Sequence, residues 1–348
     1  MTRKVVVGLG IAVALAILVW FAWPKPPSKT PTKTVAAGSA KVETPSVAFD
    51  PRTPPIAATG IAAPADSQAG SFFPFGAEPS SLGRGTSPEG KPVAPSSFLA
   101  DADGVLVLDQ EKQRLVRADG TSIPLPGKHA DDVARGADGS LAVLDRKDAK
   151  DVAILDANGH VRGRLPLEGT GIDDPRDVSR VVVSGNDVYV ERNGGGPLLR
   201  LGGMDGKPAE NRTEIQGIPT RDGAGLISAG ITNEDEGRAW LNMADRNAVH
   251  RWTRELKFPA ELSAVAFLDS DPNGSIWVVL LAGSTPADYV NWAVCVDPKD
   301  GKAKKSITLG VENPPWESFR DFAIRPGGTL VAATRSEKGV TFASYDCP

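Results

Sequence analysis

The sequence predicts an all-β fold, a six-bladed β-propeller of four-stranded blades, preceded by one transmembrane helix and a disordered linker. Short apolar strands separated by polar turns recur from Pro95 to the end of the chain. No segment after Gly70 shows sustained helical periodicity. Glycines in the turns recur with the period of a propeller blade, since the first and the last are 224 residues apart and span five intervals of about 45 residues. These glycines are Gly104, Gly139, Gly185, Gly237, Gly274 and Gly328.

The composition of the chain argues against several classes of function, including nucleic-acid binding. The chain has 348 residues and a net charge of -4, which gives no electrostatic reason to expect a nucleic-acid partner. Two cysteines are too few for a disulfide scaffold or for a structural zinc site made of cysteines, and three histidines leave little room for metal or triad chemistry. No nucleophile elbow and no phosphate-binding loop is present in the sequence.

An apolar run predicts an N-terminal transmembrane anchor within residues 1–23. Val5 to Trp23 are 19 apolar residues, just enough as a helix to cross a bilayer core of about 30 Å. Arg3 and Lys4 precede the run, and Trp20 lies near its far end, where aromatic rings favour the interface. A cleaved signal peptide and a buried helix are the alternatives; signal peptides have shorter apolar cores of about 7–15 residues. Positive charges flank both ends, and we expect the large domain outside the cytoplasm, periplasmic or extracellular.

Residues 24–70 predict a flexible linker. This stretch contains nine prolines and a single aromatic residue, Phe49, among many Ala, Ser and Thr residues. Such a composition buries too little apolar surface to offset the entropy of ordering the chain. We therefore expect a semi-extended tether between the anchor and the propeller.

The remaining chain, residues 71–348, predicts the propeller. The last blade has only three strands before the chain ends at Pro348. Residues 71–76 have the short apolar-proline pattern of the fourth strands in other blades, so we expect them to close the last blade; an apolar patch at the end of the linker is the alternative. In blade four, residues 225–233 are expected to form the first strand, followed by a turn at Gly237.

Two strands resemble a known group of repeats. A turn that ends in Asp-Gly, and has the form Asp-x-x-Gly in blade one, precedes Val105-Leu106-Val107-Leu108-Asp109 in blade one and Leu141-Ala142-Val143-Leu144-Asp145 in blade two. These segments resemble NHL-type repeats, and the broader group includes the six-bladed TolB-like and SMP-30/gluconolactonase-like propellers. The resemblance implies ligand or protein binding at the top face or channel mouth. Blades four and five depart from the pattern.

Three blades open with an aspartate at one position of the repeat: Asp132, Asp177 and Asp321. The first strand of a blade lines the central channel, so these carboxylates could together bind a cation, with calcium as the candidate. The alternative is that each aspartate stabilises a turn or bonds to backbone amides between blades. Asp109 and Asp145 end second strands, with Asp245 as a counterpart, and we expect them to stabilise turns.

Four further residues are candidates for a binding surface. His129, Asp174 and Arg176 lie beside the predicted carboxylate ring in sequence. Trp316 lies in the loop between blades five and six, where an exposed tryptophan could anchor a partner. For the tryptophan, the alternative is a residue that fills a gap between blades.

The two cysteines lie in third strands of neighbouring blades. Cys295 is in the third strand of blade five and Cys347 ends that of blade six. Packed sheets are about 10 Å apart, whereas a disulfide needs Cα atoms within about 7 Å, so the sequence leaves a disulfide between them open.

Two functions from different classes remain. The first is a membrane-tethered, extracytoplasmic, non-catalytic binding or scaffold module for a protein, peptide or glycan partner. The second is a metal-dependent, lactonase-like hydrolase or lyase that uses the carboxylates at the channel mouth. The first requires no cofactor, whereas the second requires the metal site.

Overall fold

The computed structural model describes residues 55–57, 61–62, 68–86, 92–285, 288–311 and 318–348. The chain divides into two compact units, Met1–Ser46 and Val47–Pro348, and all the described residues belong to the second. The predicted anchor and the first part of the predicted linker lie outside the described residues. Within the described ranges, no helix has the length and apolar character needed to span a bilayer.

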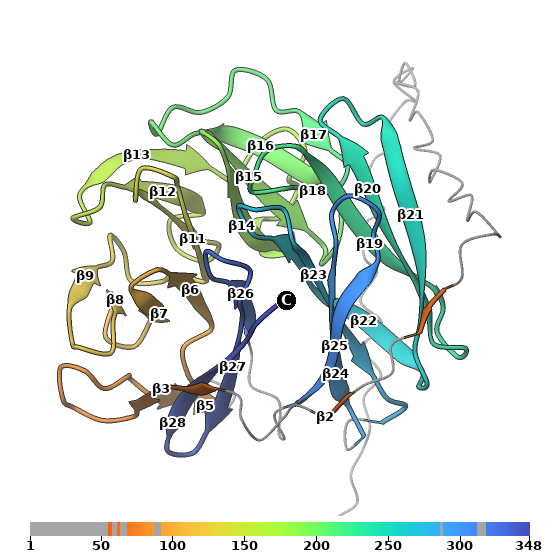
Figure 1. Cartoon of the computed structure of the whole chain (residues 1–348). Helices are drawn as coiled ribbons and strands as arrows, with labels where there is room; N and C mark the ends of the chain where they lie inside the picture. Colours follow the sequence, from red (N-terminus) through yellow and green to blue (C-terminus); the bar gives the residue numbers. More distant parts are fainter. Residues whose placement is uncertain (1–54, 58–60, 63–67, 87–91, 286–287, 312–317) are drawn as a thin grey trace, which may run out of the picture. The chain divides into compact units, whose positions relative to one another are not determined.

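The second unit is an all-β propeller of six blades, which confirms the predicted six-bladed propeller of four-stranded blades (Figure 1). Each blade is an antiparallel sheet whose first strand lies toward the centre of the ring. The first strands of neighbouring blades contact one another: β10 (Asp132–Arg135) contacts both β6 (Ser97–Asp101) and β14 (Val178–Ser184). In the same way β26 (Phe322–Ile324) contacts β6 and β22 (Leu262–Ser270).

The remaining strands of blades one to three are β7 (Gly104–Asp109), β8 (Arg114–Val116), β9 (Ser122–Pro124), β11 (Leu141–Asp145), β12 (Asp151–Leu155), β13 (Val161–Pro166), β15 (Asp187–Arg192), β16 (Leu198–Gly203) and β17 (Glu214–Ile215). Those of blades four to six are β18 (Ile218–Pro219), β19 (Gly225–Asn233), β20 (Arg238–Asp245), β21 (His250–Lys257), β23 (Ile276–Ala282), β24 (Val290–Val296), β25 (Ala303–Gly310), β27 (Leu330–Ser336), β28 (Gly339–Tyr345) and β3 (Gln68–Pro74). A small two-stranded sheet, β4 (Gly85–Thr86) with β5 (Pro92–Val93), and one 3₁₀ helix, η1 (Pro175–Asp177), lie in connections.

The core is divided into layers between blades. Alternate residues of a strand point to opposite faces of its sheet, so one blade can contribute to two layers. In β11, Ala142 and Leu144 belong to the cluster shared with blade three, whereas Leu141 and Val143 belong to the cluster shared with blade one. Both faces of the blade-two sheet are therefore buried, which explains why its strands β11 and β12 are rich in Val, Leu and Ile rather than strictly alternating with polar residues.

The ring is closed by a strand from the N-terminal side of the propeller. Strand β3 pairs antiparallel with β28, with Phe73 opposite Val340, and forms the fourth strand of blade six. The sequence placed this strand at residues 71–76; in the structure it begins at Gln68 and ends at Pro74. Phe73 is 1% exposed and packs edge-on against Phe342 at 5.5 Å between ring centroids.

Part of the predicted linker also pairs with the propeller. Strand β1 (Ile56–Ala57) runs parallel to β21 at the outer edge of blade four. Strand β2 (Ile61–Ala62) runs parallel to β25 at the outer edge of blade five. The segment that leads to β3 therefore adds short fifth strands to two blades, and the flexible linker predicted for residues 24–70 does not extend over these positions.

Blade four begins earlier than the sequence indicated. Its first strand is β18, which has only two residues, and residues 225–233 form the second strand, β19. The turn between them contains Gly223, with φ of 70° and an amide that donates to the Thr220 carbonyl at 2.8 Å. Gly237 lies in the next connection, between β19 and β20.

This shift changes the counterpart of Asp245. Asp245 ends a third strand, and its carboxylate accepts hydrogen bonds from the amides of Asn247 and Val249 at 2.8 and 2.9 Å. Asp156 in blade two accepts from the amides two and four residues further along in the same way. Asp245 therefore corresponds to Asp156, and the predicted match with Asp109 and Asp145 is wrong, although its turn-stabilising role is present.

Cys295 and Cys347 form a disulfide with a Cα–Cα distance of 5.9 Å. Cys295 is buried in β24, whereas Cys347 lies two residues beyond the end of β28. Because the chain has left the sheet at that point, it can approach blade five more closely than two packed sheets can. The bond therefore joins the end of the described chain to the neighbouring blade.

Phe73→Ala is expected to destabilise the protein by about 3–5 kcal/mol, because it removes a fully buried aromatic ring from the closing strand. The matched control is Phe72→Ala, since Phe72 is 50% exposed on the same strand and should change stability by less than about 0.5 kcal/mol. Chemical denaturation of the full chain measures both. Equal losses in the two variants would contradict the role of β3 in closing the ring.

Candidate functional site

The candidate site is the end of the propeller at which the first strands of blades two, three and six begin. The connections that meet there come from different blades and surround the mouth of the central channel. We call this surface the channel-mouth face and define it by the connections at residues 125–131, 146–150, 167–177 and 318–321.

Arg320 reaches across this end of the ring. Its Nε and Nη2 atoms donate to the two carboxylate oxygens of Asp132 at 3.1 and 2.9 Å, and Nη2 also donates to the Val181 carbonyl at 3.2 Å. Arg320 precedes the first strand of blade six, whereas Asp132 begins that of blade two and Val181 lies in that of blade three. The Arg320 side chain is 12% exposed and that of Asp132 is fully buried.

Other blades also hold the Asp132 carboxylate. Ser97 in blade one donates its hydroxyl to Oδ1 at 2.5 Å, and the Val181 amide donates to Oδ2 at 2.9 Å. Together with the two bonds from Arg320, the carboxylate accepts four hydrogen bonds from three other blades. A buried carboxylate is costly unless it is paired and hydrogen-bonded, and Asp132 meets both conditions.

Electrostatics keep Arg320 charged in this buried position. Burial by itself lowers the pKa of the guanidinium. The charge and hydrogen bonds of Asp132, with the more distant charges of Asp269 and Glu191, outweigh that effect and raise the pKa of Arg320 above its usual value. Arg320 therefore stays positively charged beside the Asp132 carboxylate.

The three aspartates proposed as metal ligands lie in different surroundings. Asp177 is exposed in η1, whereas Asp321 accepts hydrogen bonds from Arg335 at 2.7 Å and from Ser318 at 2.8 Å. Asp132 is saturated by the bonds described above. No group of three or more His, Cys, Asp or Glu side chains that could hold a metal occurs within the described ranges. Asp132, Asp177 and Asp321 therefore do not form the predicted carboxylate cluster among the residues that the structure describes.

Three of the predicted binding residues lie on the channel-mouth face. His129 is half exposed, and its Nε2 lies 3.5 Å from Oδ2 of Asp148 in the same blade. Asp174 caps η1 and accepts from the Arg176 amide at 2.9 Å. Hydrogen bonds from the Arg176 side chain and amide lower the pKa of Asp174 to about 2, so both groups are charged. Trp316 lies outside the described residues.

A further pair on this face was not singled out from the sequence. The Arg146 guanidinium lies over the Phe319 ring, 4.2 Å from its centroid. Its Nη1 donates to the carbonyls of Arg176 and Val178 at 2.9 and 3.0 Å. Arg146 therefore connects blade two with the start of blade three at residues 176–178 and with the segment that carries Phe319 and Arg320. Neither Arg146 nor Phe319 occurs in a pattern that would have marked it in the sequence.

Comparisons with known proteins concern the fold. No protein-family model matches the chain, and no curated protein matches it. Among solved structures, a protein of unknown function from Bacteroides caccae aligns at 15% identity and a TM-score of 0.43, over 62% of this chain and 82% of that one.

Two further solved structures align over most of their length. The PQQ-bound aldose sugar dehydrogenase of Streptomyces coelicolor aligns at 13% identity and a TM-score of 0.38, over 79% of this chain and 98% of that one. BamB from Moraxella catarrhalis aligns at 10% identity and a TM-score of 0.32, over 79% and 92%. With TM-scores below 0.5, these alignments carry no conclusion about this chain. The NHL-type assignment stays a prediction.

Arg320→Met is expected to destabilise the protein by about 3–5 kcal/mol, because it leaves the buried Asp132 carboxylate without a counter-charge. Arg176→Met is the matched control: it also precedes an aspartate at the start of a blade, but its side chain is 81% exposed, so a change of less than about 0.5 kcal/mol is expected. Adding Asp132→Asn to Arg320→Met should restore part of the loss. Denaturation with urea tests this, and a small loss in Arg320→Met would contradict the role assigned to the pair.

Proposed function

We propose that this chain is a membrane-tethered, extracytoplasmic and non-catalytic binding module whose channel-mouth face holds a protein or peptide partner. The observation that supports the proposal most directly is the environment of Asp132. This central carboxylate is fully buried and bonded within the ring, so it serves the scaffold. The exposed side chains around it are then the groups available to a partner.

The chemistry of the face suits a polypeptide partner. His129 and Arg176 present polar groups that are 49% and 81% exposed. Arg146 and Phe319 hold each other in a stacked arrangement next to them. Arginine and aromatic side chains are enriched in protein–protein interfaces, and side chains that are already fixed lose less entropy on binding. The ring supports these loops from a rigid base, as scaffolds of binding loops commonly do.

The location outside the cytoplasm rests on the predicted anchor at residues 5–23 and is supported by the disulfide between Cys295 and Cys347. Disulfides persist in oxidising compartments and are rare in the cytosol. The proposed arrangement places the propeller on the oxidising side of the membrane, with the anchor on its N-terminal side.

Site-specific photo-crosslinking in cells tests the binding face. A photoreactive residue in place of Arg176 is expected to give a discrete crosslinked product, because it lies on the channel-mouth face. The matched control replaces Asp103, whose side chain is 82% exposed in the turn between β6 and β7, at the opposite end of the strands. Equal products from both positions, or no product from position 176, would refute the proposed face. Calcium-dependent lactone hydrolysis by the purified chain would favour the enzymatic alternative.

Thiol labelling tests the location. In cells lysed under a thiol-blocking reagent, both cysteines are expected to resist alkylation until a reductant is added, because the disulfide forms in an oxidising compartment. The Cys347→Ser variant, which frees Cys295, serves as the control after denaturation. Rapid labelling of both cysteines in the unreduced wild-type chain would contradict the proposed location.

A further inference from the structure

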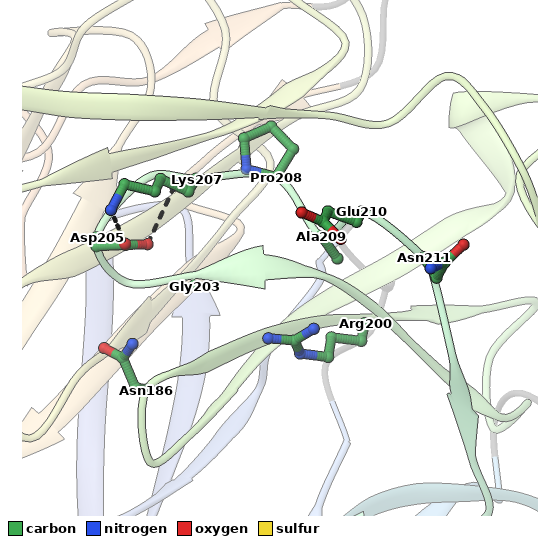
Figure 2. A pocket seen from close by; sticks show the side chains of 9 residues that line it. All are labelled: Asn186, Arg200, Gly203, Asp205, Lys207, Pro208, Ala209, Glu210 and Asn211. Carbon is green, nitrogen blue, oxygen red and sulfur yellow. Dashed lines mark hydrogen bonds and ion pairs between the residues drawn. The ribbon is translucent and has the colours of Figure 1, made fainter.

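A pocket of about 460 Å³ lies on blade three, away from the channel-mouth face. It is formed by the turn between β14 and β15, by Arg200 of β16 and by the connection from β16 to β17. This connection begins at the end of the first strands opposite the channel mouth and then runs along β16 toward the channel-mouth face. Figure 2 shows its walls. The volume falls within the range of about 300–1,000 Å³ that is common for small-molecule sites. The polar side chains that line it are Asn186, Arg200, Asp205, Lys207, Glu210 and Asn211.

The pocket exists because blade three departs from the repeat. Its connection between third and fourth strands covers residues 204–213, which is ten residues counted from the strand bounds. The same connection in blades one and two covers residues 117–121 and 156–160, which is five residues each. An extension that one repeat unit has and its neighbours lack is where a repeat fold commonly adds a function.

The extended connection is held firmly in place. The Gly203 amide donates to the Lys207 carbonyl at 3.1 Å, and the Ala209 amide donates to the Leu201 carbonyl at 2.8 Å. At Gly206 the connection touches blade two so closely that a Cβ on Gly163 would lie 2.5 Å from the Gly206 carbonyl oxygen. Backbone contact of this kind requires glycine.

The far end of the connection is also anchored. The Arg212 guanidinium donates to the carbonyls of Pro166, Leu167 and Glu168 at 2.6, 2.9 and 3.1 Å. These carbonyls belong to the end of blade two and the connection that follows. Because both ends of the extension are fixed to blade two, the pocket walls are formed before a ligand arrives, which lowers the entropy lost on binding.

The groups facing the pocket include both donors and acceptors. Arg200 donates from Nε to Asp187 at 2.8 Å, which fixes the guanidinium, and Figure 2 shows the side chain extending beneath the connection. Its terminal nitrogens supply donors. The amides of Asn186 and Asn211 offer one donor group and one acceptor each, and the Glu210 carboxylate offers acceptors.

The charges of the lining balance. Arg200 and Lys207 are positive, whereas Asp205 and Glu210 are negative, and Lys207 forms an ion pair with Asp205 at 3.0 Å. An anion or a cation would gain little from such a lining. A neutral ligand with several hydroxyl groups can use it fully, because each hydroxyl both donates and accepts hydrogen bonds. We propose that the blade-three pocket binds a neutral saccharide.

Calorimetric titration of the purified full chain with maltotriose, cellotriose and chitotriose tests the proposal. At least one of these neutral trisaccharides is expected to bind, with affinity reduced at least tenfold by Arg200→Met, since a hydrogen bond from a charged donor is lost. Asn211→Ala should weaken binding as well. The matched control is Arg164→Met, since Arg164 also pairs with an aspartate on an outer region of its blade, is 41% exposed and does not line the pocket.

Unchanged melting temperatures would show that Arg200→Met and Asn211→Ala leave the fold intact; if Arg200→Met unfolds, Asn211→Ala alone decides. Absence of binding to all three probes overturns the proposal, and so does binding that Asn211→Ala leaves unchanged. Preference for an acidic trisaccharide such as trigalacturonate over all three would overturn the assignment to a neutral ligand. Because the pocket and the channel-mouth face are separate, the crosslinking at position 176 and this titration can fail independently.

Discussion

The carboxylate of Asp132 links four of the six blades at the centre of the molecule. Its own strand belongs to blade two, and its hydrogen bonds come from Ser97, Val181 and Arg320 in blades one, three and six. The desolvation of a buried ion pair is costly and is offset only when every oxygen is well bonded. This requirement fixes the spacing of four first strands, and the loops that lead into those strands take their positions from it. The arrangement of the channel-mouth face thus depends on an interaction that is itself inaccessible to a partner.

The number of blades could be predicted from the sequence because turns with positive φ favour glycine and recur once per blade. Blade four shows the limit of that reasoning. Its first strand has two residues, Ile218 and Pro219, which are too few to show an alternation of apolar and polar residues. The second strand, at residues 225–233, was therefore predicted as the first. The strands at residues 56–57 and 61–62 were not predicted for the same reason: each has only two residues. Their pairing with a sheet edge uses backbone groups and leaves no side-chain pattern in the sequence.

The candidate site was only partly predictable. Asp132 could be placed near the channel because it opens a first strand. Its partner could not be identified, because Arg176-Asp177 and Arg320-Asp321 are the same dipeptide at the same position of the repeat. Arg176 bonds to Asp174, two residues earlier, and stays at the surface. Ser318, two residues before Arg320, offers no carboxylate, and Arg320 instead pairs with a residue 188 positions away. A local pattern cannot reveal a choice that depends on so distant a partner.

The short strands β1 and β2 reduce the length of open sheet edge to which another chain could pair at the outer side of blades four and five. Open sheet edges can template the addition of a foreign strand. Blades four and five have part of that rim occupied by their own polypeptide, whereas β9, β13 and β17 are the outermost strands of blades one, two and three. Self-association by edge pairing should therefore be less favourable at blades four and five than at the other blades, including blade six, whose outermost strand is β3. A recombinant fragment that starts at residue 68 would keep the closing strand but would expose the outer edges of blades four and five. It would therefore aggregate more readily than the longer chain.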